Sequence, residues 1–224
     1  MGDQIDVYAG VHKGQRVRFF DIMMKAGTMD YDDKDSLDIL YHELTALKEH
    51  VFLHASLEER FIHPLLSESV PGGARKLEED HRTMHQQFDD IIEQLDGVRT
   101  RSTESELRGK LVLEFYRAWN RFISFYFMHI NEEEENAQPM LWKICTAKEL
   151  DDAHKAMIFS QNFEELKYDL QIMLPAMNVH ERPEIFYAAR VSMSPQVYQS
   201  LLKFAEQLLN PKDWATLRLE IGSD

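Results

Sequence analysis

The feature that most constrains the fold of this chain is a set of histidine and glutamate residues that recur at helical spacing. Three pairs are each separated by four positions, and one further histidine stands alone near the start. Four residues along a helix turn through about 400° and rise about 6 Å, so both members of a pair lie on one face. The positions are His12, His54 with Glu58, His81 with His85, and His129 with Glu133. The spacing therefore predicts helices whose polar groups meet in one interior.

The apolar pattern predicts that the whole chain is helical. Apolar residues recur at helical spacing almost everywhere, and no convincing strand alternation is present. We expect four helices over about residues 7–25, 35–66, 74–95 and 105–142, with turns at residues 26–27, at 71–73, and at Gly97 with Ser102-Thr103. Short loops make successive helices antiparallel. The predicted fold class is all-α, an up-down-up-down four-helix bundle with a C-terminal helical extension.

The domain organisation follows from the same pattern. Residues 1–145 are predicted to form the bundle, and residues 146–224 an extension packed on it. Within the extension we expect helices over residues 147–159, 163–173, 183–191, 195–209 and 211–221. Ser194-Pro195 and Asn210-Pro211 are typical of an N-cap residue followed by the first helical residue.

Composition excludes several classes of function. The net charge of −14 disfavours nucleic acid or an anionic membrane as a partner, because both need a basic face. Cys145 is the single cysteine, so a thiolate metal cluster is excluded. The acidic first residues do not resemble a signal peptide, and no apolar run approaches the length of a membrane span. We expect a cytoplasmic protein, with a homodimer left open.

Taken one at a time, the candidate residues have ordinary explanations. A lone inward histidine such as His12 is more often a core residue than a ligand, and Glu133 lies in a run of four glutamates that a solvated face would explain. Taken together, the set favours a metal centre. Imidazole nitrogen and carboxylate oxygen suit iron, manganese or zinc, and the two oxygens of a carboxylate can bridge two ions.

The remaining histidines are set aside at this stage. His63, next to Pro64, fits a helix end, and His42 falls near the polar side of its helix. His154 and His180 have no partner at metal spacing. His50 extends the pair of His54 and Glu58 by one turn, and we leave open whether it supports the ligands from outside.

The ordered motifs resemble the hemerythrin-like, or HHE cation-binding, family. The resemblance covers about residues 8–143 and rests on a lone histidine, HxxxE, HxxxH, and a last histidine followed by an acid. The acid at four residues, Glu133, is similar to the iron–sulfur repair proteins and the iron-sensing hemerythrin domain, whereas oxygen carriers have aspartate where Glu134 stands. The spacing between motifs is also close to the repair proteins, which ranks His85 above His81.

The resemblance implies a non-haem di-iron centre with an oxo or hydroxo bridge. His12 and His54 would bind one iron, His81, His85 and His129 the other, and Glu58 and Glu133 would bridge them. Three functions follow as hypotheses. The first is a protein that binds O₂ or NO for sensing, storage or detoxification. The second is a di-iron enzyme that reduces NO or peroxide or acts in iron–sulfur cluster repair. The third is a metal-free helical interaction protein.

Overall fold

The computed structural model describes residues 5–100 and 105–222, and no strand occurs within these ranges. The chain divides into two compact units. The first consists of Met1–Tyr8 and Arg18–Ser160, and the second of Ala9–Val17 and Gln161–Asp224. Helix α1 (Ala9–Thr28) therefore contributes its first residues to one unit and its later residues to the other. The boundary expected at residue 145, and the packing of the extension on the bundle, stay predictions.

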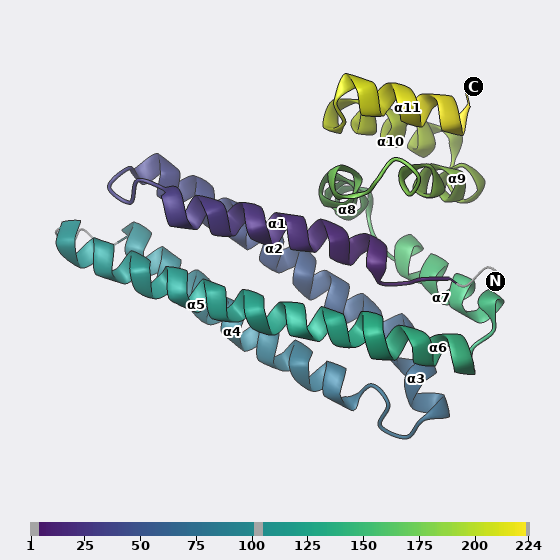
Figure 1. The fold of residues 1–224 in the computed structure, drawn as a ribbon, viewed down its shortest axis with the longest axis horizontal. Helices are drawn as coiled ribbons and strands as arrows, with labels where there is room; N and C mark the ends of the chain where they lie inside the picture. The colour runs from purple at the N-terminus through teal and green to yellow at the C-terminus, as the bar shows by residue number, and fades with distance from the viewer. Residues whose placement is uncertain (1–4, 101–104, 223–224) are drawn as a thin grey trace. The chain divides into compact units, whose positions relative to one another are not determined.

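The first unit is built from long helices, which confirms the predicted all-α bundle. Rods α2, α4 and α5 run side by side with residues 18–28 of α1, and α5 continues into α6 without a break in direction (Figure 1). The helices after α1 are α2 (Lys34–Phe61), α3 (His63–Ser69), α4 (Arg75–Thr100), α5 (Ser105–Glu132), the π-helical turn η1 (Glu133–Ala137), α6 (Gln138–Ile144) and α7 (Ala147–Phe159).

Several helix boundaries differ from the sequence prediction, and α1 runs through the turn expected at residues 26–27 to Thr28. The second helix was expected to continue to residue 66, but it ends at Phe61, and α3 starts at His63 with Pro64 in its first turn. The turn expected at Gly97 is wrong, because α4 runs through Gly97 to Thr100. Val98 is buried, so the apolar stripe continues past a glycine that a helix can tolerate at modest cost. The expected Ser102-Thr103 turn lies outside the described residues.

A side-chain cap defines the start of α2, and a proline marks the junction between α5 and α6. Asp33 caps α2, and its carboxylate accepts hydrogen bonds from the backbone amides of Asp35 and Ser36. Pro139 lies in the first turn of α6 and has no amide hydrogen to donate. The amide of Gln138 donates to the carbonyl of Glu133, five residues earlier, as in a π-helix. The resulting π turn makes α5, η1 and α6 one continuous rod.

The core of the first unit consists of two apolar clusters. One cluster is aromatic-rich: Phe19 stacks on Trp119 with ring centroids 5.2 Å apart, and Phe88 packs on Phe122 at 4.7 Å. The other gathers apolar residues of α2, α3, α4, α6 and α7 with Val7 and Tyr8 of the N-terminal segment. On each long helix, the buried residues that lie between the two clusters are polar.

The second unit consists of residues 9–17 of α1 with α8 (Phe163–Ala176), α9 (Arg182–Ser192), α10 (Pro195–Leu208) and α11 (Pro211–Ile221). The predicted caps Ser194 and Asn210 are confirmed, since each side chain accepts an amide hydrogen bond. A Cβ on Gly14 would lie 2.9 Å from the backbone of Ile172, so only glycine allows this approach to α8. The buried Arg182 donates to the carbonyl of Leu174 at 3.0 Å and pairs with Asp213 at 2.8 Å.

Candidate metal centre

A layer of buried ionisable side chains separates the two apolar clusters of the first unit. Glu133 is 0% exposed, Glu58 1% and His81 2%. Burying carboxylates in an apolar interior is costly unless cations or hydrogen bonds compensate them. The layer therefore needs positive charge at its centre, from protons or from metal ions.

Helix α2 supplies the first pair. His54 and Glu58 are one turn apart, and the Nε2 atom of His54 lies 3.0 Å from Oε1 of Glu58. The second carboxylate oxygen, Oε2, lies 3.5 Å from Nε2 of His81 on α4. Each oxygen of Glu58 thus faces an imidazole from a different helix, which is the arrangement that a bridging carboxylate requires.

The second pair comes from the junction of α5 and η1. Nε2 of His129 lies 3.2 Å from Oε1 of Glu133, and the same oxygen lies 3.8 Å from Nε2 of His81. Glu133 is the first residue of the π turn, a type of distortion that is frequent at functional sites. The Nε2 atoms of His81 and His129 are 3.1 Å apart. Two unprotonated nitrogens at this distance would repel each other, so a proton or a cation must lie between them.

A carboxylate lies beside each of these imidazoles from outside the cluster. Nδ1 of His81 makes a 2.9 Å hydrogen bond with Oε1 of Glu59, and Oδ2 of Asp80 lies 3.5 Å from Nδ1 of His129. A carboxylate at Nδ1 favours the tautomer that leaves Nε2 available, as is typical of metal-binding histidines. The sequence pattern does not single out Glu59, and its contact with His81 was missed.

The carboxylates and imidazoles of the cluster shift one another's pKa values. Burial works to raise the pKa of the Glu58 carboxyl, but the His54 and His81 imidazoles outweigh it and hold that pKa well below its ordinary value. Burial and the neighbouring Glu58 oppose ionisation of Glu133, yet His129 and His81 lower its pKa to about 2. Burial likewise acts against charge on His81, but hydrogen bonds to Glu133 and Glu58 raise its pKa to about 10. Without metal, His81 is the cation between the two carboxylates.

We expect the stability of the metal-free protein to fall on the alkaline side because of His81. Its folded pKa of about 10 exceeds the ordinary 6.5, so its contribution is complete below pH 6.5 and is lost as the pH rises towards 10. The free energy of unfolding should fall by up to about 1.4 kcal/mol per pH unit across this window. Urea unfolding of metal-free wild type and His81→Gln over this range measures the effect. Equal slopes for the two proteins would contradict it.

Tyr8 is a buried neighbour of the carboxylates that sequence reasoning missed. Burial raises the pKa of its phenol well above the ordinary value, and Glu133 and Glu58 raise it further, so the phenol keeps its proton at neutral pH. The preceding residues are held by α6: the Val7 amide donates to Gln138 at 2.8 Å, and the Trp142 indole donates to the Ile5 carbonyl at 2.8 Å. A single aromatic before the first helix gives no sequence signal for this position.

Comparison with protein-family models decides the family. The model described as the hemerythrin HHE cation binding domain matches residues 3–141, which is more than half of the chain. This chain belongs to the hemerythrin HHE cation-binding family. No curated protein and no solved structure gave a significant match.

Most of the residues that carry the HHE pattern lie in the buried layer. Among the predicted ligands, His54, Glu58, His81, His129 and Glu133 come together. His85 is only half-buried, and its ring lies flat on Phe52 with centroids 3.7 Å apart. His81, which the sequence ranked below His85, is therefore the one that lies beside the two carboxylates in this structure, and the assignment of either as a ligand stays a prediction. The reason is the length of α4. Because the helix continues to Thr100, the residue of α4 that lies level with the carboxylates is further from its C-terminal end, which favours His81 over His85.

The other histidines of this HHE protein lie in different surroundings. His12 is fully buried on α1, within the residues 9–17 of the second unit, and its role as a ligand stays a prediction. His50 is buried one turn before His54, with the two rings parallel and their centroids 6.4 Å apart. His42 and His180 are exposed, and His154 is half-buried on α7. His63, which was set aside as a helix end, is 1% exposed at the start of α3.

The donor set suits a hard or borderline divalent cation. Neutral imidazoles and carboxylates without thiolate match iron, manganese or zinc. Burial lowers the pKa of His63, so this imidazole is neutral at physiological pH and able to act as a ligand. Metal binding would replace the His81 proton by a larger positive charge and so compensate both glutamates.

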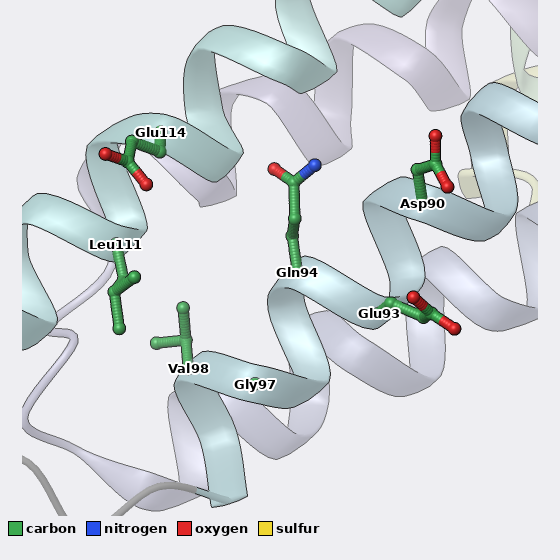
Figure 2. A pocket seen from close by; sticks show the side chains of 7 residues that line it. All are labelled: Asp90, Glu93, Gln94, Gly97, Val98, Leu111 and Glu114. Atoms are coloured by element: carbon green, nitrogen blue, oxygen red, sulfur yellow. The ribbon is translucent and has the colours of Figure 1, made fainter.

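One surface pocket lies apart from this layer. It has a volume of about 330 Å³ between α4 and α5, and Figure 2 shows that carboxylates and an amide surround it. Its lining residues are Asp90, Glu93, Gln94, Gly97, Val98, Leu111 and Glu114. It contains no imidazole, and we assign no ligand to it.

None of the described helices of this HHE protein combines the length and apolarity needed to cross a bilayer.

Proposed function

We propose that this HHE protein is a non-haem di-iron protein that takes up a small diatomic ligand, O₂ or NO, for sensing, storage or detoxification. The observation that carries the proposal is the position of Glu58, whose two oxygens face His54 at 3.0 Å and His81 at 3.5 Å. A carboxylate shared between imidazoles of two helices is the arrangement expected for a bridge between two ions.

The proposed ligands follow the family pattern. His12 and His54 would hold one iron, His81 and His129 the other, and Glu58 and Glu133 would bridge them. When bound, reduced iron supplies the electrons and the open coordination position that a diatomic ligand needs. Glu59 orients the imidazole of His81, and Asp80 lies beside that of His129. Tyr8 offers a protonated hydroxyl beside the carboxylates, and the aromatic cluster excludes bulk water from one side.

One observation favours the enzymatic alternative. With His85 stacked on Phe52, the family positions supply four imidazoles, and a four-histidine centre leaves openings on both ions. Such a centre suits a di-iron enzyme that reduces NO or peroxide, or that acts in iron–sulfur cluster repair. The two functions therefore differ in how many imidazoles the centre holds.

Two measurements on the full chain test the proposal. Protein purified without chelator should hold about two iron ions per chain. The anaerobically reduced protein, mixed in turn with O₂, NO and peroxide, should give a stable and reversible charge-transfer band with O₂ or NO. Continuous consumption of the ligand would favour the enzyme. A fully folded preparation that binds no metal would contradict both and favour a helical interaction protein.

A further inference from the structure

His63 is a buried imidazole for which the family pattern has no use. It lies at the start of α3 and is 1% exposed. Within the described part of the chain, neither of its ring nitrogens has a hydrogen-bond partner. The nearest carboxylate, that of Glu78, lies 4.0 Å from Nδ1, beyond hydrogen-bond reach. A buried imidazole in this state is unfavourable unless another group occupies its lone pair.

The side chain of His63 faces the buried layer. Its ring lies 5.3 Å from the ring of His81, nearly parallel to it. Ligand atoms of His63, His81 and Glu133 all lie within 4.8 Å of one another, and all three residues are buried. Atoms bound to one ion at about 2.1 Å each are separated by about 3–4 Å, so a small local rotation would bring all three to a single ion.

His85 has the opposite surroundings. It is half-buried, and its ring is held flat against Phe52 on α2. To reach Glu133 it would have to leave this stacking contact, whereas His63 is already inside the layer.

We propose that His63, in place of His85, is the third imidazole at the ion held by His81, His129 and Glu133. The inference rests on the proposed di-iron function and deepens it. With His12 and His54 at the other ion, the centre then has five imidazoles, and an open position remains on one ion only. This count favours reversible uptake of a diatomic ligand over chemistry that needs openings on both ions.

Matched leucine variants of the full chain test this assignment. His63→Leu and His85→Leu each remove one imidazole and leave an apolar side chain of similar size. After anaerobic loading and desalting, wild type and His85→Leu should keep about two irons per chain, and His63→Leu about one. The metal-free His63→Leu protein should melt no lower than metal-free wild type, because the change removes a buried polar group that lacks a partner. His63→Gln provides a second variant should the leucine protein fail to fold.

The outcomes separate this inference from the proposed function. Iron loss in both His63 variants, with His85→Leu unchanged, supports the assignment. Wild type with about two irons, and His63 variants that keep both, would overturn the assignment but leave the di-iron function intact. Iron loss in His85→Leu would also overturn it. Wild type that takes up no iron would overturn the function and the assignment together.

Discussion

Replacing His54 with alanine should remove most of the bound iron while leaving the protein helical. Its Nε2 atom faces Oε1 of Glu58 at 3.0 Å, so the variant loses a proposed ligand and the partner of the proposed bridge. Loss of an outer partner of a metal site already lowers affinity about 10- to 100-fold, and loss of a ligand should cost more. Alanine favours helix more than histidine does, so α2 itself should not weaken. Iron analysis and far-UV circular dichroism measure the two effects.

His42→Ala is the matched control for this prediction. It makes the same chemical change on the same helix, but His42 is exposed and far along α2 from the buried layer. Its iron content should equal that of wild type. Unchanged iron in His54→Ala would contradict the ligand assignment, whereas equal loss in both variants would point to a general effect on α2.

Iron removal should lower the melting temperature of the wild-type protein by about 10 °C. A ligand present at about 1,000 times its dissociation constant stabilises the folded state by about 4 kcal/mol, which in a chain of this size corresponds to roughly that shift. The structural reason is the proximity of two fully buried carboxylates, Glu58 and Glu133, each of which opposes ionisation of the other. Without iron, the imidazoles of His54, His129 and His81 compensate them.

Thermal melts of the same preparation, before chelation, after chelation and after anaerobic reloading with iron, measure this shift. His54→Ala serves as the control, because a variant that holds little iron should show little change on chelation. A wild-type melting temperature that chelation leaves unaltered would mean that the layer is satisfied by protons alone, and would count against a resident metal.

Several helix boundaries were predictable because their signals are local. A proline in the first turn and a preceding Asn or Ser define the starts of α10 and α11, and side-chain caps formed as expected. The boundaries that were predicted wrongly depend on packing against residues far away in the sequence. The chain breaks between α2 and α3 at Ile62, a fully buried residue of the second apolar cluster, and α4 passes through Gly97 because Val98 packs in the first cluster.

The sequence by itself determined the helical class, the family and the pairs His54–Glu58 and His129–Glu133, because residues four apart share a face in any α-helix. Only the tertiary structure decided that His81 and not His85 meets the carboxylates, and that His63, Tyr8 and Glu59 lie beside them. Spacing along one helix fixes which side chains point together. The level at which separate helices meet, and the direction of a side chain after a break, depend on how the whole interior packs.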